Sequence, residues 1–494
     1  MSVQPASRTA AQSPIARVVE RLFGRLRLRF LPVLLTYFCY GASAISGVAL
    51  VFFEKNVLGL TPAEVAEIGF WLGLPWSMKM VAGTASDHYP ILGSRRKAYL
   101  LLGAFCSLLG YGWLATLVSA KGDFLLAMLM VTVGFMIQDV VADALSVEVA
   151  ENEEELKQIQ ALGRMALLLG GISVGYLGGW LAGEIGVRKV FGLAMVLPLL
   201  VVASICLLPE ERTPREFPTG EDPGAGWKPS LIMAGGLAYA SLSAALQYFG
   251  AAYTQEIVLI LSGLVIAFLL KLVGVSRSIV IAASVIFLFR STPGVGQGYQ
   301  YWAIDQLGFD ERFLGLLSQV SSVLSLAGLV IFRKTIVQRP VSFTLFWVVL
   351  AGSVLYLPSI GLFYGVNEWL GISPRMFALI DTTISAPLGQ LTMVPILVLI
   401  AKSVKPGNEA TTFAIMASLM NLALSASELF TRYLNELFSV SQQDYSNLGV
   451  LMITVGIIGL LPLCALPLLK REESAGTEPR HGKLAGTIRE TTSP

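Results

Sequence analysis

The chain has 494 residues, of which 54% are hydrophobic and only 14% are charged, and its formal net charge is +2. Soluble globular domains carry about 25% charged residues, so this composition excludes an ordinary soluble protein and gives no basis for binding nucleic acid. Many continuous apolar runs of about 20 residues instead predict an all-α polytopic membrane protein.

Fourteen apolar spans follow one another along the chain. Six precede a polar, proline-rich linker, at 30–53, 61–82, 98–120, 123–148, 159–182 and 188–208. Eight follow it, at 231–250, 255–273, 278–303, 313–335, 341–365, 376–401, 410–434 and 447–469. We expect a basic N-terminal segment at 1–29, a six-helix bundle at 30–208, a cytoplasmic linker at 209–230, an inserted helix pair at 231–277, a second six-helix bundle at 278–469 and a disordered tail at 470–494.

Basic residues and a faint internal repeat indicate how these spans are arranged. The basic residues gather at one set of loop ends, which by the positive-inside rule places both termini in the cytoplasm, at a bacterial inner membrane or a plasma membrane. The segment "NVLGLTPAEVAEIGF" after the first span is similar to "DQLGFDERFLGLLSQV" after the span at 278–303. Two six-helix halves of equal topology are the plan of major facilitator superfamily transporters, although chance similarity between two short segments is the alternative.

The loop "GTASDHYPILGSRRK" after the second span carries a candidate gating motif. Gly83 and Asp87 have the glycine-x-x-x-aspartate spacing of the superfamily's cytoplasmic signature, and Arg95 and Arg96 supply its basic end. An aspartate here can pair with arginine or accept hydrogen bonds from a helix N-terminus. We therefore expect a latch that stabilises one gate state. The alternative is a solvated loop that obeys the positive-inside rule.

Two carboxylates inside the fourth span need partners. Asp139 and Asp143 are four residues apart and share one helix face, and a carboxylate in the middle of a lipid-embedded helix costs about 2.5–3.5 kcal/mol. We expect Asp143 to pair with Arg164 of the next span, with Lys79 as a second candidate partner. The network is either static, or it breaks and reforms during transport, with Asp139 as a candidate for taking a coupling proton.

Arg290 lies near the middle of its span, and no acidic residue within two helical turns can neutralise it. The glycines and proline of "STPGVGQG" follow and should interrupt the helix. A mid-membrane cation beside a broken helix is where transporters hold anionic substrates. Arg290 is therefore expected to contact substrate, or else to pair with a carboxylate such as Asp139. Gln297, Tyr299 and Tyr301 are expected to line the same cavity.

The remaining polar residues in spans have two interpretations each. Gln390 lies near mid-depth and is a candidate substrate contact, while Asp381 and Glu428 are candidates for an outer gate or for proton access. Hydrogen bonding between helices explains each equally well. The sequence shows no metal-ligand cluster, no nucleophile–base pair and no phosphate-binding loop. We therefore expect no cofactor, no metal, no enzymatic activity and no ATP-driven pumping.

Several stretches together resemble the folate–biopterin transporter family of the major facilitator superfamily. They cover roughly residues 30–208 and 278–469, and the combination is specific although no single stretch is. They are "LGLTPAEVA", "LPWSMKMVAGTASDHYPILGSRRKAYLLLGA", "DVVADALSVE", "FLFRSTPGVGQGYQYW", "DQLGFDERFLG", "LGQLTMVPILVLIAKSVKPGNEATTFAIMASLMNLALSASELFTRYL" and "NLGVLMITVGIIGLLPL".

The resemblance implies a transporter of folates or reduced pterins, usually with proton-coupled uptake. Arg290 could then meet a substrate carboxylate bidentately, and Tyr299, Tyr301 or Trp302 could stack on the pterin ring. The family's charged positions fall here on Lys79, Asp87, Asp139, Asp143, Arg290, Gln390, Glu409 and Glu428.

Two other functions of the same fold stay open. The family also takes in members that resemble transporters of other metabolites, such as S-adenosylmethionine. Related branches of the superfamily resemble assembly factors that do not transport. By analogy we expect a monomer in lipid, with a small organic anion and protons as its partners.

Overall fold

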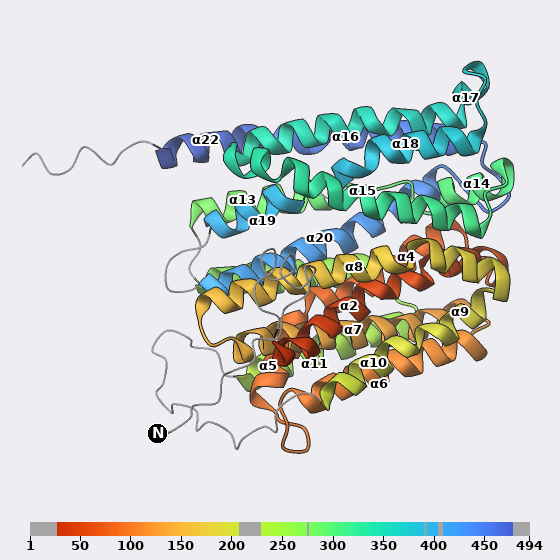
Figure 1. The fold of residues 1–494 in the computed structure, drawn as a ribbon. Helices are drawn as coiled ribbons and strands as arrows, with labels where there is room; N and C mark the ends of the chain where they lie inside the picture. The colour runs from red at the N-terminus through yellow and green to blue at the C-terminus, as the bar shows by residue number, and fades with distance from the viewer. Residues whose placement is uncertain are drawn as a thin grey trace, which may run out of the picture.

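The computed structural model describes residues 27–206, 229–273, 276–389, 391, 393–403 and 409–477. Within these ranges the regular elements are helices, apart from one isolated bridge between Ile91 and Ser94. The helices run side by side in two bundles (Figure 1). Most of the linker expected at 209–230 and most of the terminal segments expected at 1–29 and 470–494 lie outside the described residues. The start of the tail expected to be disordered is helical instead, because the helix Leu466–Thr477 runs through it.

The first bundle, here called the N-half, contains residues 28–205. A first rod is built from α2 and α3, joined by a 3₁₀ turn and ended by a π-helical turn at Phe53–Val57. Its helices are α2 (Leu31–Ala42), α3 (Gly47–Phe52), α4 (Pro62–Ser77), α5 (Lys79–His88), α6 (Lys97–Thr116), α7 (Lys121–Val149), α8 (Glu153–Ile185), α9 (Val187–Ala194) and α10 (Val196–Ile205). Thr61 and Glu64 form a capping box that fixes the start of α4.

The second bundle, the C-half, repeats this plan after an inserted pair. The pair is α11 (Pro229–Tyr248) and α12 (Thr254–Val273). The C-half contains α13 (Arg277–Arg290), α14 (Gly298–Leu307), α15 (Glu311–Gln338), α16 (Val341–Phe363), α17 (Val366–Trp369), α18 (Pro374–Gly389), α19 (Met393–Ser403), α20 (Glu409–Leu437), α21 (Leu448–Ile458) and α22 (Leu466–Thr477). The architecture is thus the expected one: an all-α membrane protein of two helical bundles.

Eleven helical stretches among the described residues are long and apolar enough to cross a membrane. The expected spans at 61–82, 278–303 and 376–401 are not among them because each is broken into two shorter helices. The break after Arg290 falls where the glycines and proline of "STPGVGQG" predict it. The breaks at Met78 and after Gly389 were not expected.

Close packing of backbones joins the two halves along two seams. One seam lies between α4 and α20, and the other between α8 and α15. A Cβ atom added to Gly73 would lie 2.3 Å from Ser425 Oγ, and one added to Gly179 would lie 2.2 Å from the Glu311 carbonyl oxygen. Glycine is therefore required at position 179, where the close atoms are backbone, while Gly73 leaves room for the Ser425 hydroxyl. Such small residues are typical of closely packed membrane helices.

The end of the molecule that holds α9, α14 and α17, opposite α13 and α22 (Figure 1), is called the distal end, and the other the proximal end. At the distal end Lys55 Nζ lies 2.8 Å from Asp305 Oδ2, and Gln442 donates to the Leu60 carbonyl over 2.7 Å. Arg312 also pairs there with Glu184. These contacts, each between the N-half and the C-half, close the distal end.

The inserted pair packs against the seam between α4 and α20. Gln255, at the start of α12, is 3% exposed. It donates from Nε2 to the Glu67 carbonyl of α4 over 3.3 Å and accepts from Arg432 of α20 over 2.7 Å. The pair therefore bridges both halves at this seam.

A methyl group at Gly179 should force α8 and α15 apart. We expect Gly179→Ala to lower the free energy of unfolding by about 1–3 kcal/mol, the usual cost of overpacking. Gly183→Ala is the matched control, because its added Cβ would meet its nearest atom at an ordinary 3.6 Å. Thermal unfolding in detergent gives the Tm of both variants. Equal Tm values would contradict the close packing of α8 against α15 at this seam.

Candidate functional site

Charged and polar side chains of four N-half helices meet within the bundle. Lys79, the first residue of α5, forms an ion pair with Asp139 of α7. One turn further along α7, Asp143 accepts a hydrogen bond from Tyr37 of α2. Arg164 of α8 faces both Tyr37 and Asp143. These five residues are called the N-half charge cluster.

The expected pair between Asp143 and Arg164 is not formed, although the structure describes both residues. Tyr37 takes the position next to Asp143, and α8 comes so close to α2 that a Cβ on Gly163 would lie 2.7 Å from the Tyr37 ring. Lys79, the second candidate, is the residue that neutralises a carboxylate here, and that carboxylate is Asp139. The break at Met78 lets Lys79 begin a new helix beside α7.

Exposure within the cluster increases toward the proximal end. Asp139 is buried, whereas Asp143 and Arg164, one turn nearer the proximal end of their helices, are exposed. Charged side chains inside spans face the bundle interior or a water-filled space rather than lipid. Asp143 and Arg164 are therefore accessible on the proximal side of the cluster, while the distal end is closed.

Two aromatic rings lie beside the ion pair. Trp76 stacks on Tyr40 with ring centroids 5.5 Å apart, and Lys79 Nζ lies 5.3 Å from the Trp76 ring centroid. Asn421 of α20 donates to the Trp76 carbonyl over 3.0 Å. The cluster thus offers a cation, a carboxylate and aromatic faces next to the C-half.

Side chains of α20 form hydrogen bonds with the non-helical backbone that follows Arg290. The Gly294 amide donates to Thr431 Oγ1 over 2.9 Å, and Ser427 Oγ donates to the Thr292 carbonyl over 2.7 Å. Asn435 donates to the Val295 carbonyl over 3.1 Å. Backbone groups freed by the helix break are therefore satisfied by side chains of one neighbouring helix, so the break is a stable feature.

Arg290 itself has no partner among the described residues. Its Nε is buried without a hydrogen bond, and no described carboxylate lies within ion-pair distance. The alternative partner Asp139 is occupied by Lys79. A half-buried guanidinium inside a span, without a counter-ion, has N–H donors free for an anion, and this makes Arg290 a candidate site.

Tyr299 and Tyr301 do not line one cavity with each other. They are two residues apart on α14, which places them on opposite faces. Tyr299 lies near Asp381 and Ser359 in the C-half, where Ser359 donates to Asp381 over 2.9 Å. Tyr301 is fully buried, with Lys55 Nζ 5.2 Å from its ring centroid. Gln297 lies at the start of α14, and its Oε1 is buried without a hydrogen bond.

The gating motif forms ion pairs within the N-half. Arg96 lies 2.8 Å from Asp87 and 2.7 Å from Glu148 of α7, and Arg95 precedes it in the loop. A Cβ on Gly83 would meet its nearest atom at an ordinary 3.7 Å. Nearby, the guanidinium groups of Arg29 and Arg27 lower the pKa of Glu151 to about 2, so this link stays ionised at neutral pH.

Glu428 lies on the seam between the halves. A Cβ on Gly69 of α4 would come within 3.0 Å of its carboxyl group, so glycine at position 69 makes room for it. Gln390 and the side chain of Glu409 lie outside the described residues.

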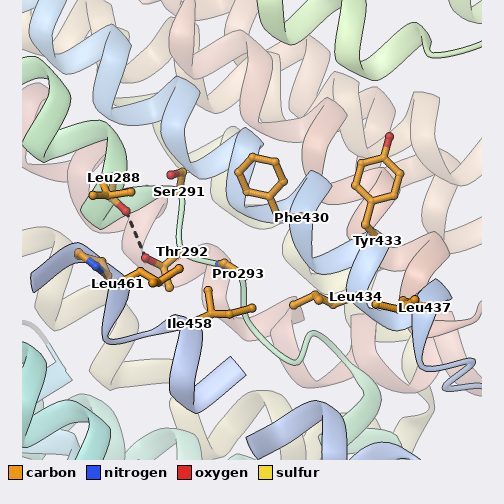
Figure 2. A pocket seen from close by; sticks show the side chains of 11 residues that line it. Leu288, Ser291, Thr292, Pro293, Phe430, Tyr433, Leu434, Leu437, Ile458 and Leu461 are labelled. Atoms are coloured by element: carbon orange, nitrogen blue, oxygen red, sulfur yellow. Dashed lines mark hydrogen bonds between the residues drawn. The ribbon is translucent and has the colours of Figure 1, made fainter. Parts of the chain in front are cut away.

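A groove of about 340 Å³ runs beside the break after Arg290. Figure 2 shows Pro293, Phe430, Leu434 and Ile458 around it. Its lining is almost entirely apolar, and Arg290 does not contribute to it. The groove therefore does not suit a charged substrate.

Sequence reasoning missed the residues that close the distal end. Lys55 and Asp305 are 250 positions apart, and Tyr445 donates to Asp305 over 2.6 Å. Lys55 immediately precedes one of the two similar segments of the internal repeat and Asp305 begins the other, so the repeat is the one sequence signal that relates the two positions. In the sequence Tyr37 is one more aromatic residue in an apolar span, so no pattern indicates that it is the partner of Asp143.

Comparisons with known proteins agree with this geometry. A model of the BT1 family matches residues 41–483. A folate-biopterin transporter of Synechocystis sp. is 30% identical over 441 residues, which cover 89% of this chain and 81% of the relative. Folate transporter 2 of Plasmodium falciparum is 23% identical, over 88% of this chain and 86% of its own length.

Solved structures match the fold. The chain superposes on a POT family transporter in complex with 5-aminolevulinic acid with a TM-score of 0.66, over 92% of this chain and 98% of that one. Sequence identity is 13%, so this likeness supports the fold only.

Removal of one partner from the Lys79–Asp139 pair should leave a charge without compensation. We expect Asp139→Asn to lower the free energy of unfolding by about 1–3 kcal/mol. The double variant Lys79→Met with Asp139→Leu should recover part of the loss, because it removes both charges. Thermal unfolding in detergent is the measurement.

The control is Lys157→Ala, which removes an exposed ion pair with Glu153. Such pairs contribute about 0.3–0.5 kcal/mol. If Asp139→Asn changed Tm no more than Lys157→Ala does, the pair would not contribute to stability.

Proposed function

The chain belongs to the BT1 family, and we propose that this membrane transporter moves a folate, a pterin or a related organic anion with proton coupling. It is not an enzyme. The observation that carries the proposal is Arg290, a cation inside a span with no partner among the described residues, beside a broken helix.

Arg290 suits a carboxylate of the substrate. A guanidinium offers two parallel N–H donors that match the two oxygens of a carboxylate, and such pairs are strongest away from water. The Synechocystis and Plasmodium relatives are named as transporters of folate or biopterin. Folates carry a dicarboxylate tail, so Arg290 would bind that tail.

The N-half charge cluster would bind the other end of the substrate. The stacked rings of Tyr40 and Trp76 present flat aromatic surfaces beside Lys79. A pterin is flat and rich in hydrogen-bonding groups, and aromatic pairs contribute about 0.5–1.5 kcal/mol beyond their buried area. We expect the substrate to lie between the halves, with its ring toward α4.

Transport would follow alternating access. The distal end is closed by Lys55–Asp305 and Arg312–Glu184, whereas Asp143 and Arg164 are exposed on the proximal side of the charge cluster. If the proximal end is cytoplasmic, as the basic residues predict, this is the inward-open state. Opening the distal end would separate both ion pairs.

A transporter for another metabolite would use the same residues to bind a substrate with a different ring or tail. A non-transporting assembly factor is favoured by no described contact, because it has no need of an unpartnered Arg290.

Arg290→Ala should abolish uptake of labelled folate into proteoliposomes that carry an inward proton gradient. Loss of a buried, charge-assisted contact costs 2–5 kcal/mol, which corresponds to a fall of about 30-fold or more in affinity. Arg290→Lys should keep the charge but lose the bidentate contact, and should transport weakly. Lys157→Ala, far from the site, is the control and should transport as the unmodified protein does.

Normal uptake by Arg290→Ala would remove this residue from the site. No uptake of folate or pterins by any variant, with folded protein shown by thermal unfolding, would favour another metabolite or the assembly factor.

A further inference from the structure

Glu54 is a buried acid that the proposed site does not use. It lies in the π-helical turn Phe53–Val57 and is 8% exposed. Its Oε2 is buried without a hydrogen bond, and no described basic side chain forms an ion pair with it. π-helical turns are rare and are found frequently at functional sites.

The side chains around Glu54 belong to the closed distal end. The next residue, Lys55, forms an ion pair with Asp305 of α14, and its Nζ lies 5.2 Å from the Tyr301 ring centroid. Tyr301 of α14 faces Glu54, and the Tyr301 hydroxyl is also buried without a hydrogen bond. Glu64 of α4 and Tyr445 lie near the same hydroxyl.

The other charged groups nearby are engaged elsewhere. Arg188 of α9 lies over the Phe53 ring and donates to the Val118 carbonyl over 2.6 Å. Glu184 of α8 and Arg312 of α15 pair with each other. None of these groups compensates a negative charge on Glu54.

Burial without compensation makes the charge state of Glu54 depend on the distal end. An ionised carboxylate removed from water without a partner is strongly disfavoured, whereas a neutral carboxylic acid is not. When the halves separate at Lys55–Asp305, Tyr301 withdraws with the C-half and water reaches Glu54. The carboxylate is then solvated and lies beside a free Lys55.

We propose that Glu54 is a proton-binding site whose occupation accompanies closure of the distal end. The open distal end exposes a carboxylate that takes one proton from water, and the halves close over the neutral acid. This deepens the proposed function, on which it rests because it requires the distal end to open and close during transport.

The experiment measures opening of the distal end directly. Val51 of α3 packs against the C-half core that contains Tyr301 and Trp302, so Val51→Cys would report opening by its reaction with a membrane-impermeant maleimide. The reporter is placed in a background without Cys39, Cys106, Cys206 and Cys464, none of which is paired. Labelling is measured from pH 5 to pH 9 in proteoliposomes without substrate. Each rate is divided by that of the same cysteine in unfolded protein at the same pH, because the thiolate is the reactive form and its fraction itself rises with pH. This ratio is called the labelling rate.

We expect the labelling rate of the reporter protein to rise with pH, by roughly tenfold per pH unit where one group controls opening. Glu54→Gln should label slowly at every pH, since the amide cannot ionise. Glu64→Gln is the matched control: Glu64 is a neighbouring acid that Lys121 and Thr61 already partner, so its pH dependence should be that of the reporter protein.

A pH dependence that survives in Glu54→Gln, or its absence from the reporter protein, would overturn the proposal. Glu54→Leu replaces the glutamine variant if thermal unfolding shows that the latter does not fold. The labelling assay uses no substrate, so it tests the proton site separately from the proposed substrate. If folate uptake failed but Glu54→Gln still lost the pH dependence of labelling, folate would be contradicted as the substrate and the proton site would be supported.

Discussion

A charge inside an apolar span needs a partner or water, and the arrangement of the two halves depends on how this constraint is met. Lys79 and Asp139 meet it within the N-half, so their pair survives any rigid movement of the halves. Lys55 and Asp305 meet it between the halves, so their pair exists only while the distal end is closed. One ion pair thus stabilises a bundle, and the other stabilises a conformation.

The two seams differ in how the halves meet. Gly175 and Gly179 on α8 face Gln319 and Gly315 on α15, so the two backbones lie close together there. At the other seam, buried apolar side chains of α4 and α20 belong to one core cluster, among them Phe70, Leu74 and Leu419. The distal ion pairs join charged groups of the two halves and so stabilise the closed distal end.

The sequence predicted those features that depend on residues close together in the chain. Apolar runs gave the helices, and the glycines after Arg290 gave the break. Asp139 and Asp143 were recognised as needing partners, but Tyr37 and Lys79 as the actual partners depend on how α2 and α5 pack on α7. The link between Lys55 and Asp305 joins segments 250 residues apart, and periodicity carries no information on such a pairing. Glu54 was missed because nothing in "FFEKNV" shows that its helix ends in a buried π-helical turn.

Arg290 and Glu54 separate a transporter from a scaffold of the same fold. Each is a charged residue type held in the bundle without a partner among the described residues, and burial of such a group without a partner costs stability. A protein that only held a shape would gain nothing from that cost. The proposed transporter would use both groups: a cation that binds an anionic substrate, and an acid whose charge changes as the halves move. Arg290 precedes the helix break in the C-half, and Tyr301, which lies near Glu54 of the N-half, follows it. Because α20 fixes that break, a movement of the C-half would carry the proposed substrate contact and the cover over Glu54 together.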